Sequence, residues 1–376
     1  MSKTASLDAA EVYTSRAQSG LYDSAVDQIL ELPHGTALAM SNYKDDFSRV
    51  TNNWSGNFSY QSTGTTVEHE TILIGQLCHS SLGTKFSARG NHYPGTGFNP
   101  NFIDDKSRIK FLFTLSVPTK ATHRMHALWD NQIATLNEVI DADRTEPRLT
   151  ARQTLSFKEW TDHSTEDKAL APDLINILSG QIYVVPKGKQ STDDPTAKRA
   201  KIAKTTIAKS ANVEEASNPV LSDFDTDMHD GEVKPALDGA IPTSPPVASL
   251  ASPNDLFNPR VLPDYGGELF RHEKAMLRQL DMRDTDNNLV PPEAWYSTFT
   301  PGSLIMARVT MHAFSWESRR IYQLHAHSIR LLDGSREDVE ERLGSAIPNN
   351  ASPATSSNTA ASNAMSSFSL GKRDRE

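Results

Sequence analysis

The stretch 277–333, LRQLDMRDTDNNLVPPEAWYSTFTPGSLIMARVTMHAFSWESRRIYQLHAHSIRLLD, decides the fold of this chain because it predicts three strands with a turn between each. Along 304–316, successive side chains point to opposite faces, as in any β-strand. One face is uniformly apolar and is expected in a core: Ile305, Ala307, Val309, Met311 and Ala313. The other starts apolar and becomes cationic and aromatic: Leu304, Met306, Arg308, Thr310, His312, Phe314 and Trp316.

The run 320–332 alternates again after a turn at 317–319, and so short a link predicts a hairpin. One face of this second run consists of Tyr322, Leu324, Ala326 and Ser328, and the other of Ile321, Gln323, His325 and His327. We expect Val309 and Met311 to pack with Leu324 and Ala326. The opposite face of the hairpin would then gather Arg308, His312, Phe314, Trp316, Gln323, His325 and His327.

Aromatic rings on a cationic sheet face are what single-stranded nucleic acid needs, because bases stack on rings while cations follow the phosphates. Residues 301–332 hold four arginines against the single acid Glu317, within a chain whose net charge is -9. Such a local excess of positive charge is typical of a nucleic-acid footprint. The alternatives are that Phe314 and Trp316 pack in the core and that Arg319 and Arg320 only solvate a turn.

The order of a short strand, a Gly-containing turn, a long strand with aromatics, a basic turn and a Tyr-x-Leu strand resembles the C-terminal half of an oligonucleotide-binding (OB) fold. It is similar in particular to the single-stranded-DNA-binding proteins of phages and mobile elements. The matching segments are 301–304, Phe314 with Trp316, and 322–329. The block 319–330 is also similar to the end of a family of mushroom-type fungal proteins. The resemblance implies an elaborated OB-like, five-stranded β-barrel.

Composition sets outer bounds on the chain. Only 37% of its 376 residues are hydrophobic, which predicts long disordered parts. The single cysteine, Cys78, excludes an internal disulfide and indicates a reducing compartment. No apolar run approaches the roughly 18 residues that span a bilayer, and no signal peptide is evident, so we expect no membrane contact and a soluble intracellular protein.

Further patterns divide the chain into five parts. We expect a flexible N-terminal arm at 1–28 and the first part of a mainly β domain at 29–186. That part would include strands at 71–77 and 108–117, a helix at 119–143, a loop at 87–101, and a short helix at 172–178 followed by a strand at 181–185. A disordered linker is predicted at 187–255, the C-terminal β part of the same domain at 256–340, and a disordered tail at 341–376.

Charge is segregated within the predicted linker. Cations gather in 187–209, where Lys198, Arg199 and Lys201 match a nuclear-import pattern, or simply form a solvated charge run. Acids gather in 214–238, which could recruit a protein partner or compete with nucleic acid for the basic face. The sequence therefore favours a nuclear or cytoplasmic location.

The leading hypothesis is a protein that binds single-stranded DNA or RNA without catalysis and without a cofactor. Its expected contacts are Arg308, His312, Phe314, Trp316, Arg319, Arg320, Tyr322 and Arg330, to which Arg108 and Lys110 could add. A second hypothesis is a scaffold protein whose linker is a regulated docking segment. A third is a metal-dependent enzyme using His312, His325 and His327, since three imidazoles from adjacent strands suit zinc.

Overall fold

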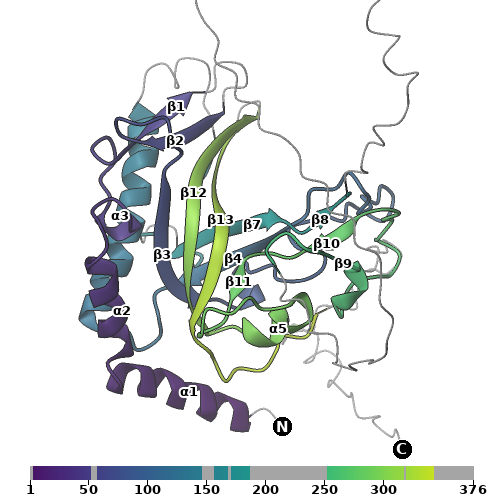
Figure 1. Cartoon of the computed structure of the whole chain (residues 1–376), viewed down its shortest axis with the longest axis horizontal. Coiled ribbons are helices and arrows are strands. Elements are labelled where there is room, and N and C mark those ends of the chain that lie inside the picture. The colour runs from purple at the N-terminus through teal and green to yellow at the C-terminus, as the bar shows by residue number, and fades with distance from the viewer. Residues whose placement is uncertain are drawn as a thin grey trace, which may run out of the picture. The chain divides into compact units, whose positions relative to one another are not determined.

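The computed structural model describes residues 3–51, 57–145, 156–167, 171–186, 252–316 and 319–342. The described residues all belong to one compact unit. The unit is mainly β; helices α2 and α3 stand along one side of a large sheet, whereas the short helix α5 lies on the other side of the β12–β13 hairpin (Figure 1).

The elements follow one another along the chain as α1 (Lys3–Gln18), α2 (Leu21–Leu30), β1 (Phe47–Thr51), β2 (Phe58–Ser62), β3 (Glu70–Leu77), β4 (Lys110–Ser116), α3 (His123–Thr145), β5 (Ser156–Lys158), β6 (Thr161–Asp162), β7 (Leu174–Gln181), β8 (Tyr183–Val184), β9 (Leu256–Phe257), β10 (Met276–Arg278), β11 (Met282–Arg283), α5 (Trp295–Thr298), β12 (Leu304–Trp316) and β13 (Arg319–Asp333). Short 3₁₀ turns lie at Leu38–Met40, Ser80–Leu82, Pro259–Val261 and Pro292–Ala294.

The described strands form a ten-stranded sheet and a small three-stranded sheet in the order β8-β10-β9. In the large sheet, β12 pairs with β3, β3 with β4, β4 with β7, β7 with β13, and β13 with β12. Pairing among these five strands therefore returns to the strand at which it starts. Strands from the N-terminal and C-terminal parts of the chain thus share one sheet.

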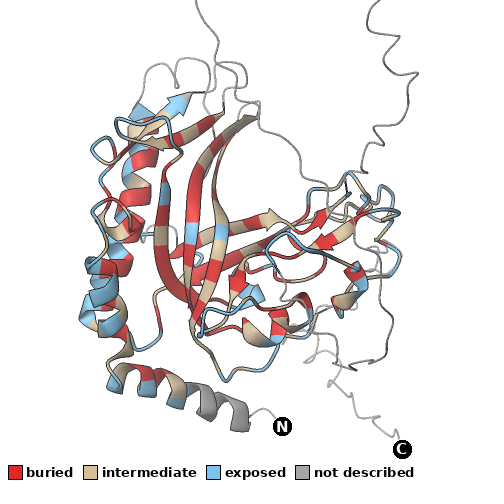
Figure 2. Ribbon diagram, viewed as in Figure 1, coloured by how far each residue is buried: buried red, intermediate tan, exposed pale blue. Residues whose placement is uncertain are grey.

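The hairpin of β12 and β13 has the predicted partners. Val309 lies opposite Ala326 and Met311 opposite Leu324, and the five apolar residues predicted for the core face of β12 are all fully buried. Figure 2 shows these buried positions running along the two strands. This prediction is confirmed.

A β-bulge interrupts the ladder where sequence alternation predicted none. Arg308 pairs with Ser328 but Val309 pairs with Ala326, so His327 is left as the extra residue of β13. Core positions in β13 therefore change parity, from Tyr322 and Leu324 before the bulge to Ile329 and Leu331 after it. Arg330 and Leu332 consequently share a face with His325, which strict alternation had excluded.

Helix α3 confirms the helical spacing predicted at 119–143 and packs on β3. Its apolar stripe, including Trp129 and Leu136, is buried in the main core. Gln132 completes the edge of β3: its amide oxygen accepts from the Ile74 backbone N–H at 2.8 Å, and its amide nitrogen donates to the Ile74 carbonyl at 3.0 Å. A Cβ at Gly75 would lie 2.7 Å from the Trp129 ring, so glycine permits this close approach.

Helix α2 covers the apolar half of the outer face of β12. Tyr22, Val26 and Ile29 form a second buried cluster with Leu304 and Ile74, against which Met306 also packs. The outer face of β12 is therefore divided, since its first residues are covered by a helix while the later ones, from Arg308 onward, lie beyond this cluster.

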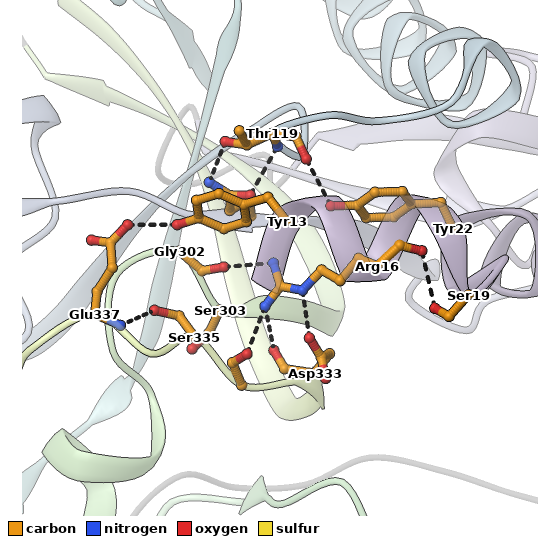
Figure 3. A network of polar contacts seen from close by, with 12 residues as sticks. Tyr13, Arg16, Ser19, Tyr22, Thr119, Gly302, Ser303, Asp333, Ser335 and Glu337 are labelled. Carbon is orange, nitrogen blue, oxygen red and sulfur yellow. Dashed lines mark hydrogen bonds and ion pairs between the residues drawn. The ribbon is translucent and has the colours of Figure 1, made fainter. Parts of the chain in front are cut away.

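The segment expected to be a flexible arm instead forms helices α1 and α2, and an arginine fastens it to the end of β13 (Figure 3). Arg16 is only 2% exposed and pairs with the carboxylate of Asp333. Its guanidinium also donates to the carbonyls of Gly302 at 2.9 Å and Gly334 at 2.8 Å. Arg16 thus contacts residues that lie more than 280 positions further along the chain, and no local sequence pattern reveals such contacts.

Other predictions have mixed outcomes. Strands β3 and β4 and the irregular loop 87–101 lie where they were expected. The short helix predicted at 172–178 is wrong, because most of this segment belongs to strand β7. The predicted linker up to residue 251, and the tail from 343 onward, lie outside the described residues. Among the described helices, none combines the length and apolar character that crossing a bilayer requires.

Replacing Arg16 by Ala should lower the free energy of unfolding by about 3 kcal/mol, because it leaves the Asp333 carboxylate and the carbonyls of Gly302, Asp333 and Gly334 without their donor. Urea denaturation would measure this loss. The matched control is Arg124→Ala, which removes an ion pair with Asp27 whose side chains are 47% and 58% exposed. That control should cost less than about 1 kcal/mol. Equal effects of the two substitutions would contradict the fastening role of Arg16.

Candidate nucleic-acid interface

Three flat rings gather on the outer face of the β12–β13 hairpin, and we call His312, Phe314 and His325 the ring platform. The centroids of His312 and His325 are 4.4 Å apart, and Phe314 lies 6.0 Å from His312 and 6.1 Å from His325. The planes of Phe314 and His312 differ by only 16°. Each of the three side chains is partly exposed. The three rings are therefore stacked or tilted against one another in one partly exposed cluster.

The imidazoles of the platform are held neutral. Burial, reinforced by the nearby charge of Lys110 and by the other two histidines, lowers the pKa of His325 to about 3. Burial likewise lowers the pKa of His312. At neutral pH these rings therefore offer aromatic surface and hydrogen-bonding nitrogens rather than positive charge.

Polar contacts fix the orientation of the histidines. Nε2 of His325 lies 3.0 Å from Oε1 of Gln323 and 3.4 Å from Nζ of Lys110. The hydroxyl of Thr310 lies 3.1 Å from Nε2 of His312 and 3.0 Å from Nε2 of His327. The side chain of Thr310 therefore links His327, at the bulge, to His312 of the platform.

Lys110, at the start of β4, connects the platform to the loop 87–101. The backbone of Asn91 donates to the Lys110 carbonyl at 2.9 Å, and the Asn91 side-chain oxygen accepts from the Lys110 backbone N–H at 3.0 Å. Further along this loop, Phe98 is 90% exposed and Tyr93 is 69% exposed. Two large aromatic side chains therefore stand in solvent on a loop that is anchored beside the platform.

Two acids lie beside the same face. The carboxylate of Glu70 pairs with Arg308 at 2.6 Å, and that of Glu68 lies 3.3 Å from His312. Both pairs are partly exposed, so each contributes little to stability. They reduce the positive charge of the surface instead.

Two of the predicted contact residues lie in the core instead. Tyr322 is buried, and its hydroxyl donates to the Asp143 carboxylate at 2.7 Å. Arg320 is also buried, with its guanidinium 4.9 Å from the centroid of Phe58. The predictions that Tyr322 stacks bases and that Arg320 binds phosphates are wrong, because both residues share the inward face with Leu324.

The remaining predicted contacts are dispersed along the hairpin. Arg319 is exposed at the end near the platform, whereas Arg330 lies toward the other end and donates to the Thr285 carbonyl at 3.1 Å. Arg308 lies between them, opposite the bulge. The side chain of Trp316 lies outside the described residues, as do Lys198, Arg199, Lys201 and the acidic segment 214–238, so these remain predictions.

No family model matches the chain, and no curated protein or solved structure is significantly similar to it.

The three histidines are not arranged as a metal-ligand set. Nε2 atoms of both His312 and His327 face the Thr310 hydroxyl, and His325 contacts Lys110, a cation. Within the described ranges, no group of three or more His, Cys, Asp or Glu side chains is placed to hold a metal ion. The described residues thus give no support to the metal-dependent hypothesis.

Sequence patterns did not identify every residue around the platform. The sequence predicted Lys110 only as an additional phosphate contact, and it predicted no ligand contact for the exposed aromatics Tyr93 and Phe98. The signal for these two was available, since large aromatics in a segment rich in Gly, Pro and Asn have no core to enter.

Stability should fall as the pH drops below 6.5, the ordinary pKa of histidine, toward about 3, the pKa of His325. In this window the unfolded chain takes up a proton at residue 325 and the folded chain does not, so the free energy of unfolding decreases with pH. The variant His325→Gln should show a shallower decrease in chemical denaturation at pH 6.5, 5.5 and 4.5. Because burial is the main cause, the difference should persist at high salt. Identical pH slopes for the two proteins would contradict this assignment.

Proposed function

We propose that this protein binds single-stranded nucleic acid on the outer face of the β12–β13 hairpin, without catalysis. The observation that carries the proposal is the ring platform, a cluster of parallel or gently tilted rings beside Lys110. Stacking of a base on an aromatic side chain contributes about 1–3 kcal/mol, and it tolerates any base sequence. Because the platform imidazoles are neutral, they suit stacking while the surrounding lysine and arginines supply charge.

We further propose that β3, β4, β7, β13 and β12 form an elaborated OB-like barrel. Support comes from the pairing of each of these strands with two others of the set, including the parallel pairing of β7 with β13. In OB folds, the faces of the second and third strands and the loops after the first and fourth strands bind oligonucleotides. The corresponding parts here are β4, β7, the segment 78–109 and the end of the β12–β13 hairpin. Lys110, the exposed aromatics of 87–101 and the platform therefore belong to the parts that such a barrel uses.

Loss of the Phe314 ring should weaken binding. We expect Phe314→Leu, which keeps an apolar side chain but no ring, to reduce the affinity for fluorescein-labelled oligo-dT by roughly tenfold, which is within the energy of one stacked base. The matched control Phe314→Tyr keeps the ring and should bind almost as the parent protein. Fluorescence anisotropy at two salt concentrations measures both. If Phe314→Leu, shown to be folded by its thermal transition, bound as tightly as the parent, the proposal would be wrong.

Removing a negative charge beside the face should have the opposite effect. Glu70→Gln leaves Arg308 without its carboxylate partner and removes repulsion of phosphates, so binding should become several-fold tighter at low salt. The gain should vanish at high salt, since the effect is electrostatic. Asp27→Asn, which breaks a comparably exposed ion pair with Arg124 on the helices, is the control and should leave the affinity unchanged. A tightening of equal size in both variants would assign the effect to net charge alone.

A further inference from the structure

A pocket of about 340 Å³ opens beside the bulge of β13, and it is not part of the ring platform. Its wall includes 326–329 of β13, which are the residues around the register shift, together with Arg308 from β12. Gly180 of β7 and Arg278 of β10 also line the pocket. Bulges are common next to binding sites, where they redirect a side chain, and here the redirected residue is His327.

Arg278 is the central feature of this pocket. Its side chain is about half buried, and its Nε atom is buried without a hydrogen-bond partner. In the described part of the chain, no carboxylate offsets the burial that lowers the pKa of Arg278. The one acid in the pocket wall, Asp281, accepts a hydrogen bond from Arg283 at 2.7 Å instead. A buried N–H donor without a partner is costly until an acceptor completes it, and an anion is the acceptor that a guanidinium favours.

Because Gly180 has no side chain, it leaves room for the guanidinium of Arg278. A Cβ at Gly180 would lie 2.3 Å from Nη2 of Arg278, so any side chain at this position would displace the guanidinium. Gly180 does not have a positive φ, so alanine is compatible with its backbone. The close approach of the guanidinium is therefore the structural reason for glycine at this point of β7.

Side-chain contacts connect the pocket with the ring platform. His327 in its wall is joined to His312 through the Thr310 hydroxyl. On the other side, the charge of Arg278 helps to lower the pKa of Lys110, after burial and together with Arg108, and Lys110 contacts His325 of the platform. A chain bound on the platform would thus pass close to the pocket.

We infer that this pocket is a phosphate site, in which the guanidinium of Arg278, assisted by Arg308 and His327, binds a backbone phosphate of a strand lying on the platform. Arginine suits this task because its planar donors match two phosphate oxygens. The inference rests on the proposed function, since it assigns the path of the same ligand. It adds a contact from β10, outside the β12–β13 hairpin in which the sequence predicted most of the nucleic-acid contacts.

The test compares Arg278→Gln and Gly180→Ala with the parent protein in oligo-dT anisotropy over a series of salt concentrations. Each variant should bind at least about fivefold more weakly at low salt, and its salt slope should decrease by about 0.7, the value for one phosphate contact on a single strand. Arg260→Gln is the matched control, because it removes the same charge from an exposed site and should change neither quantity. Far-UV circular dichroism and the thermal midpoint would confirm that each variant is folded.

Parent-like affinity and salt slope in both pocket variants, with binding by the parent intact, would overturn the phosphate site and leave the platform proposal standing. If the parent protein bound no oligo-dT, the proposed function would fail, and inorganic phosphate would then test the pocket alone. A rise of the thermal midpoint in phosphate, relative to chloride of equal ionic strength, in the parent but not in Arg278→Gln would support the site. An equal rise in both proteins would overturn it.

Discussion

Pairing between β12 and β13 is the interaction on which the rest of this structure depends. The two strands pair along their whole length, and the remaining edge of β12 is taken by β3 and β2 while that of β13 is taken by β5, β7 and β11. Side chains such as Ile305 and Met311 are fully buried on the inner face, where each contributes about 1.5–3 kcal/mol. Both the core and the outer surface therefore derive their positions from one hairpin.

Coverage by α2 determines which part of the outer surface is left for a ligand. The early residues Leu304 and Met306 are apolar and pack with the helix, whereas His312 and Phe314 lie farther along the strand and are partly exposed. Arg16 in turn holds the helical segment against the end of β13. The N-terminal helices thus have a double effect, since they bury the apolar half of the strand and confine the candidate site to the other half.

Sequence alternation predicted the two faces of the hairpin because each face has a uniform chemical character along most of its length. The assignment of Arg320 and Tyr322 as nucleic-acid contacts was wrong because residue type was given more weight than period: both positions have the parity of Leu324, which is a core position. The bulge at His327 had a signal in the sequence, since apolar residues change from even to odd positions between Leu324 and Ile329.

Other features had no such local signal. The apolar part of 172–178 is too short for its period to distinguish helix from strand. Arg278, Gly180 and Lys110 come from three separate strands, so their proximity is a property of the sheet and not of any one segment. Arg16 finds its partners at the opposite end of the chain for the same reason.

The small sheet holds together two parts of the chain that are far apart in the sequence. Strands β8 and β9 flank the same strand, β10, so the chain leaves this sheet after Val184 and re-enters it at Leu256 on the other side of one strand, about 10 Å away. Strand β10 thus holds the two described chain ends that border residues 187–251 one strand apart from each other. Pairing in this small sheet therefore joins the part of the chain before residue 187 to the part after residue 251.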